Sequence, residues 1–175
     1  MKKLFTSNFF MVTALIVIAA VARVFTPIPN FTPVAAIALF GGAYFANKYA
    51  AFLIPIAIMA LTDVWIGAYD VISMSAVYLS FALTCVIGLM ISGKVKVGRV
   101  ALGAVASSLL FFLITNFGVW MSGFCGYPMT LGGLTLCYEM ALPFFRNELL
   151  GTLVYSGVLF GAFELAKKRF PALAH

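Results

Sequence analysis

The sequence predicts an all-α membrane protein in which six transmembrane helices form one bundle with both termini in the cytoplasm. Three observations predict this class. Hydrophobic residues make up 64% of the 175 residues and charged residues only 9%, whereas a soluble domain carries about a quarter charged residues. The apolar residues fall into six stretches with short connections between them. The basic residues gather in alternate connections, as they do in the cytoplasmic loops of membrane proteins.

The distribution of charge predicts how the bundle is oriented. Nine of the eleven basic residues lie at the chain ends and in two connections: Lys2, Lys3, Lys48, Lys94, Lys96, Arg99, Lys167, Lys168 and Arg169. Arg23 and Arg146 fall in the alternate connections, together with four of the five acids: Asp63, Asp70, Glu139 and Glu148. Because cytoplasmic loops collect lysine and arginine, these four acids should lie toward the outer end.

The predicted spans are residues 8–25, 34–47, 51–67, 72–92, 99–121 and 146–166, within a single domain of residues 1–175. The first helix should end at residues 27–33, since three prolines in seven residues prevent its continuation. Residues 34–47 are rich in alanine and glycine, which let helix backbones approach closely in lipid, so this helix should be central. Pro55 is tolerable near the start of the third helix because neighbouring helices can satisfy the freed carbonyl.

The segment before the last span predicts an irregular element. Residues 122–128 should break the fifth helix, and residues 130–142 form an amphipathic stretch that is too short to cross a membrane. Pro143 should end that stretch. We therefore expect a half-helix that lies over or dips into the outer side, followed by a last helix from Arg146. Glu148 would then complement the positive N-terminus of this last helix.

The sequence does not predict an enzyme, a cofactor or a metal site. The single histidine is His175 at the chain end, no HExxH motif occurs, and Asp63 and Asp70 lack flanking glycine motifs. A glycine-rich phosphate loop is also absent from the sequence, so ATP binding is not expected. The net charge of +6 fits the cytoplasmic bias and attraction to lipid headgroups rather than nucleic acid. Cys125 and Cys137 could form a disulfide or remain two free thiols, and the sequence is compatible with both.

Polar and aromatic residues near the outer helix ends form the candidate substrate site. Ionisable residues at membrane depth are costly, so they usually face a partner or a wet cavity. The candidates are Asn30, Phe31, Asp63, Trp65, Tyr69, Asn116, Trp120, Tyr138 and Arg146. Aromatic rings would supply stacking area, while Asp63 and Arg146 would orient charged or amide groups. The alternative is an interfacial aromatic belt with salt bridges, to which Arg23 could contribute, between helix ends.

Two segments carry a family resemblance. Residues 30–45 read NFTPVAAIALFGGAYF and residues 127–151 read YPMTLGGLTLCYEMALPFFRNELLG, with NFGVW at residues 116–120. These segments resemble small bacterial membrane proteins that are similar to the substrate-binding (S) components of energy-coupling factor transporters, including solitary components that take up cobalamin. The resemblance implies six helices in the bacterial cytoplasmic (inner) membrane and a vitamin pocket at the outer face. It also implies partners, namely a transmembrane coupling subunit and ATPases.

The cobalamin-type members place a cobalt-ligating cysteine after the third helix. Here that loop offers Ser73 and Met74, and Cys85 lies too far along the fourth helix, so thiolate ligation is not expected. The leading hypothesis is a substrate-binding membrane component for uptake of a vitamin-like small molecule, with cobalamin or a related compound as the first candidate. The alternative is a membrane scaffold or accessory subunit that does not transport.

Overall fold

The computed structural model describes residues 7–67 and 70–170, and these residues form six α-helices and no strand. The helices are α1 (Ser7–Phe25), α2 (Val34–Tyr44), α3 (Lys48–Ile66), α4 (Val71–Ile91), α5 (Val97–Ser122) and α6 (Leu131–Arg169). Within the described residues, five of them are long and apolar enough to cross a membrane, and α2 is the shorter one. The chain is therefore a multi-pass membrane protein of the all-α class that the sequence predicts.

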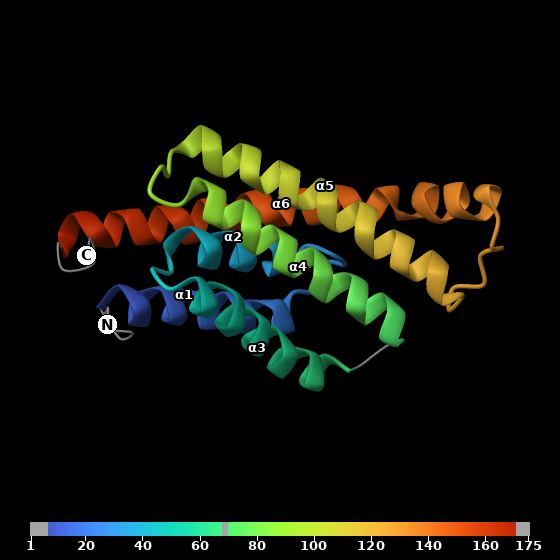
Figure 1. Ribbon diagram of the computed structural model, residues 1–175, viewed down its shortest axis with the longest axis horizontal. Helices are drawn as coiled ribbons and strands as arrows, with labels where there is room; N and C mark the ends of the chain where they lie inside the picture. Colours follow the sequence, from blue (N-terminus) through green and yellow to red (C-terminus); the bar gives the residue numbers. More distant parts are fainter. Residues whose placement is uncertain (1–6, 68–69, 171–175) are drawn as a thin grey trace.

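The connections sort into two ends of the molecule (Figure 1). The start of α1, the end of α6 and the α2–α3 and α4–α5 connections lie at one end, which we call the basic end because Lys48, Lys94, Lys96 and Lys167 belong to it. The α3–α4 and α5–α6 connections lie toward the opposite end, which we call the far end. This alternation is what the basic residues predict; that the basic end faces the cytoplasm stays a prediction.

The central element is α2, all of whose residues are buried. Its backbone meets that of α4 at two glycines: a Cβ added at Gly42 would lie 2.3 Å from the Cys85 carbonyl oxygen, and one added at Gly88 would lie 2.4 Å from the Leu39 carbonyl oxygen. On another side, Phe40 packs edge-on against Phe160 of α6, with ring centroids 5.3 Å apart. The prediction of a small-residue helix in the interior is confirmed.

The structure differs from the predicted span at residues 34–47. At 11 residues, α2 is about 16 Å long, roughly half the thickness of the hydrocarbon core. The proline-rich connection between α1 and α2 spans the rest of the distance back across the bundle (Figure 1). Its residues Asn30 and Thr32 line a cavity. Non-helical backbone is tolerated at membrane depth when it lines a cavity or is covered by protein. The chain therefore needs no sixth full-length helix.

The predicted break at Pro143 is also absent, because α6 runs without interruption from Leu131 to Arg169 and contains Pro143. Contacts with α5 on both sides of the proline hold α6 in helical form. The Tyr138 hydroxyl donates to the Leu113 carbonyl over 2.6 Å, and Phe145 packs on Phe112 with centroids 4.7 Å apart. The carbonyl freed by Pro143 belongs to exposed Glu139, where water or lipid headgroups can satisfy it.

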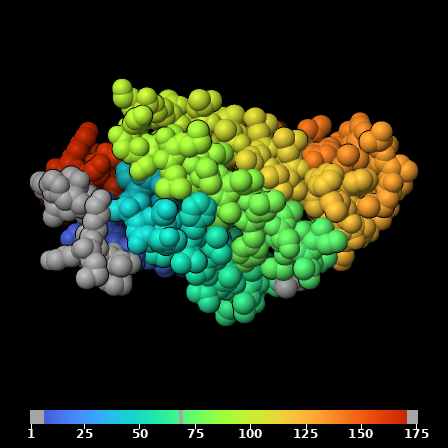
Figure 2. All heavy atoms as spheres, in the orientation of Figure 1, coloured from blue at the N-terminus to red at the C-terminus, as the bar shows by residue number. Residues whose placement is uncertain are grey.

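The length of α6 explains why the predicted half-helix is an extension of a span. Its 39 residues measure about 58 Å, well beyond the roughly 30 Å hydrocarbon core. Thr130 caps the start by accepting from the Gly133 amide over 3.1 Å. Figure 2 shows this part of α6 projecting beyond α3 and α4 at the far end. The amphipathic pattern of residues 130–142 therefore belongs to a helix that packs on α5.

Candidate functional site

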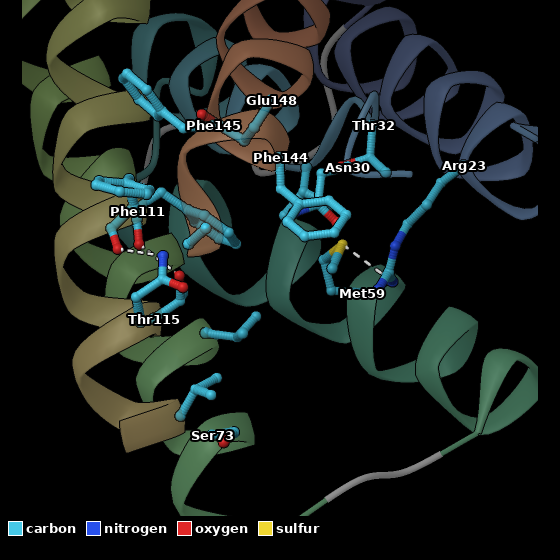
Figure 3. A pocket seen from close by; sticks show the side chains of 16 residues that line it. Arg23, Asn30, Thr32, Met59, Ser73, Phe111, Thr115, Phe144, Phe145 and Glu148 are labelled. Carbon is cyan, nitrogen blue, oxygen red and sulfur yellow. Dashed lines mark hydrogen bonds between the residues drawn. The ribbon is translucent and has the colours of Figure 1, made fainter. Parts of the chain in front are cut away.

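A cavity of about 390 Å³ is the candidate site. It lies toward the far end and receives side chains from all six helices of the described structure and from the connection between α1 and α2 (Figure 3). Its lining residues are Arg23, Asn30, Thr32, Val34, Met59, Ser73, Val77, Phe111, Phe112, Thr115, Asn116, Val119, Ala141, Phe144, Phe145 and Glu148.

One wall of the cavity is an ion-pair network around Arg23. Its Nη2 lies 2.8 Å from Asp63 Oδ1, and its Nη1 donates to the Thr62 hydroxyl over 2.7 Å. The same nitrogen lies 3.7 Å from the Met59 sulfur, a contact visible in Figure 3. The second Asp63 oxygen accepts from the Tyr78 hydroxyl over 2.6 Å. The network links α1, α3 and α4, and it neutralises the guanidinium charge beside the cavity.

The cavity lining also includes Glu148, whose side chain is buried to all but 7%. Its Oε1 accepts from the Thr152 hydroxyl over 2.9 Å. Its Oε2 has no hydrogen bond within 3.5 Å among the described residues, although the Ser108 hydroxyl of α5 lies near the same carboxyl, and the buried Ser73 hydroxyl also has no partner there. A buried polar atom without a partner costs free energy, and a buried charge costs more. These two atoms are buried in the wall of the cavity, so a bound molecule would reach them after a small movement of the side chains around them.

The polar side chains of α5 present mainly acceptors to the cavity. The Thr115 hydroxyl donates to the Phe111 carbonyl over 2.7 Å, and Asn116 Nδ2 donates to the Phe112 carbonyl over 2.8 Å. Because the Thr115 donor and one of the two Asn116 donors are directed at the helix backbone, the Asn116 amide keeps its oxygen and one N–H, and the Thr115 hydroxyl keeps its lone pairs, for a ligand.

Four phenylalanines complete the lining: Phe111, Phe112, Phe144 and Phe145. In Figure 3, Phe144 lies between Asn30 and Met59, and Phe145 lies beside Glu148. The Phe112 and Phe145 rings contact each other at an interplanar angle of 43°. Rings around a partly polar cavity give a small aromatic molecule both contact area and preferred stacking geometry.

The structure brings three of the residues predicted from sequence to this cavity. Asn30 and Asn116 line it directly. Asp63 is buried one contact away, behind Arg23. Asn30 adopts a φ of 59°, a left-handed conformation that asparagine tolerates better than most residues.

The other candidates lie outside the lining. Phe31 packs against Tyr155 with ring centroids 5.8 Å apart, and Trp120 Nε1 donates to the Pro128 carbonyl over 3.0 Å. Tyr138 contacts α5 through its hydroxyl. Trp65 is 80% exposed and Arg146 is also exposed, as expected for a belt facing lipid and headgroups. Tyr69 lies outside the described residues.

Sequence reasoning passed over Glu148 because it placed the start of the last helix at residue 146. Once α6 begins at Leu131, Glu148 is in the helix interior and shares a face with Phe144 and Phe145, four and three positions earlier. That spacing of two aromatics and one acid was the available signal. For metal binding, the described part of the chain contains no group of three histidine, cysteine or acidic side chains close enough to hold an ion.

Comparison with known proteins places the chain in a family without assigning it an activity. No curated protein matches the sequence at a significant level, and no solved structure matches the fold at such a level. Residues 3–173, nearly the whole chain, match a family of unknown function (DUF6580). The protein is a multi-pass membrane protein that belongs to this family.

Proposed function

We propose that this protein is the substrate-binding component of an uptake system for a vitamin-like small molecule in the bacterial cytoplasmic membrane, similar to S components of energy-coupling factor transporters. The observation that carries the proposal is the cavity of about 390 Å³ with the unpartnered Glu148 oxygen and Ser73 hydroxyl in its wall. Ligand sites are typically concave, mostly apolar and supplied with a few convergent polar groups.

The size of the cavity favours a compact substrate. At about 390 Å³ it is near the lower end of the volumes that ligand pockets span, roughly 300–1,000 Å³. Cobalamin, the first candidate from the family resemblance, is much larger than this space. Its binding would require the α1–α2 connection and the N-terminal part of α6 to move apart. A molecule of one or two small rings would fit without such opening.

The position of the cavity supports uptake from the far end. Its walls come from the ends of α1, α3 and α5, the start of α4 and the middle of α6. Release at the basic end would therefore require the bundle to rearrange or reorient. Partner subunits would supply the energy by ATP hydrolysis, since the sequence holds no phosphate-binding loop.

Ligand-dependent stabilisation tests the proposal. The purified protein is heated with each of a panel of water-soluble vitamins, including cobalamin. A ligand that binds the folded state raises stability by RT ln(1 + [L]/Kd), which is about 2.7 kcal/mol at one hundred times Kd. We expect at least one compact member of the panel to raise the unfolding temperature in a saturable way.

A pair of valine variants locates the binding site. Val77→Trp introduces a large side chain into the cavity lining, whereas Val86→Trp introduces it on an exposed position of the same helix. Stabilisation should disappear in Val77→Trp and persist in Val86→Trp. If no panel member stabilises the wild-type protein, the scaffold alternative is favoured, with the Arg23–Asp63 network serving to tie helices together.

A further inference from the structure

We propose that the cavity recognises a positively charged nitrogen group, so that its substrate is a compact organic cation carrying N–H donors. This inference rests on the proposed function, because it assigns a chemical class to the substrate of the same site. It follows from the charge, the hydrogen-bonding character and the aromatic content of the lining.

The charges at the cavity leave an excess of one negative group. Two lining residues are ionisable, Arg23 and Glu148. Arg23 is paired with Asp63 at 2.8 Å, so its charge is matched within the protein. Glu148 has no cationic partner among the residues that the structure describes. Arg146 is two positions away on α6, and such residues do not face each other on a helix. A cationic ligand would supply the missing partner.

The hydrogen-bonding groups point to the same class. Arg23, the strongest donor in the lining, directs N–H groups to Asp63 and Thr62. Thr115 donates to a backbone carbonyl and Asn116 uses one of its two N–H groups in the same way, which leaves both side-chain oxygens as acceptors in the same lining as Glu148. A ligand rich in acceptors would leave these oxygens unsatisfied. A ligand with several N–H groups would satisfy them.

The aromatic lining suits a cation as well. Phe144 and Phe145 lie four and three residues before Glu148 on the same face of α6, and Phe111 and Phe112 lie across from them on α5. The negative face of an aromatic ring attracts an organic cation, more strongly where water is excluded. The carboxylate and the rings would therefore act on the same charged group.

One feature favours an anion instead, and it is weaker. The first residue of α2, Val34, lines the cavity, so the positive end of this helix dipole faces it. A helix N-terminus is equivalent to a partial charge of about +0.5, which falls short of the full negative charge of a carboxylate. The dipole therefore lowers the cost of burying ionised Glu148 without reversing the sign of the site.

The test measures which charge class the protein retains. Purified protein is equilibrated with an equimolar mixture of thiamine as the cation, riboflavin and pyridoxine as uncharged compounds, and biotin and pantothenate as anions. Free compounds are removed by gel filtration, and retained compounds are identified by mass spectrometry. We expect thiamine to be retained in preference to the others. The affinity of the Glu148→Gln variant for thiamine should be roughly 10- to 150-fold lower than that of the wild type, the effect of losing a hydrogen bond to a charged group.

Two variants control for the change. Glu139→Gln removes an exposed acid from the far end of the same helix, outside the cavity lining, and should bind thiamine as the wild type does. Glu148→Asp keeps the charge and should keep the preference for thiamine, with a matching unfolding temperature as the check on folding. Retention of biotin, pantothenate or the uncharged compounds in preference to thiamine overturns the inference, as does unchanged affinity in Glu148→Gln. Retention of nothing by the wild type overturns the proposed function itself.

Discussion

Replacing Gly42 with alanine tests the packing on which the whole fold depends. The added Cβ would lie 2.3 Å from the Cys85 carbonyl oxygen, 2.9 Å from the Gly88 Cα and 3.0 Å from the Leu89 nitrogen. All three are backbone atoms of α4, so no side chain can rotate to make room. The two helices would have to separate by roughly 1 Å before the closest contact reached van der Waals distance.

The expected effect is the difference between two terms. Alanine is better than glycine in a helix interior by about 1 kcal/mol. Overpacking a core costs about 1–3 kcal/mol and more where the neighbours cannot move. Since α2 is enclosed on all sides, separation from α4 would push it into α1, α3 or α6. We therefore expect Gly42→Ala to destabilise the protein by about 1–2 kcal/mol in net terms, the upper part of the range that the two terms leave.

The assay is unfolding in mixed detergent micelles, with Gly157→Ala as the matched control. Gly157 is also in a helix, but an added Cβ there meets no atom within 4 Å among the described residues. That variant should show only the gain in helix propensity. The double variant Gly42→Ala/Gly88→Ala should cost less than the two single changes together, because one separation relieves both overlaps. Equal stability of Gly42→Ala and Gly157→Ala would refute the close approach of α2 and α4.

Two further predictions concern topology and the ion pair. Ala46→Cys and Gly98→Cys, both exposed at the basic end, should resist a membrane-impermeant thiol reagent applied to intact cells. Native Cys125, which is exposed in the α5–α6 connection, should react with the same reagent. The reverse pattern would contradict cytoplasmic termini. Asp63→Asn should destabilise the fold by roughly 3–5 kcal/mol because it leaves the Arg23 side chain, which is only 14% exposed, without its charged partner. Arg23→Met combined with Asp63→Leu should recover much of that loss in thermal unfolding. A loss below about 1 kcal/mol in Asp63→Asn would mean that the pair behaves as an exposed one.

The sequence was sufficient for the features that depend on local composition. Apolar run length located α1, α3, α4 and α5, and the alanines and glycines of residues 34–44 correctly marked the interior helix. The alternation of basic residues matches the two ends of the molecule in Figure 1. These properties follow from backbone satisfaction in lipid and from close approach at small residues, which leave direct traces in composition.

Features set by contacts between distant segments were not predictable in the same way. Pro143 reads as a helix end, yet packing of Tyr138 and Phe145 on α5 keeps α6 continuous. Treating Pro143 as a break placed Glu148 at a helix start, where an acid is expected for electrostatic reasons. With the helix continuous, the same residue becomes an interior acid in a cavity wall. The continuity of α6 through Pro143 is therefore what brings Glu148 into the cavity wall.

The cavity itself is a consequence of the short central helix. Five long helices enclose α2, which fills the bundle only from Val34 to Tyr44 and is locked to α4 at Gly42 and Gly88. The chain that precedes Val34, residues 26–33, is a proline-rich connection and not a helix. At that level of the bundle the enclosing helices have no central helix to pack on. Side chains such as Phe144 and Glu148 therefore face an open space instead of a helix surface. A full-length second helix would have filled that space, so the brevity of α2 provides the molecule with a site at its far end.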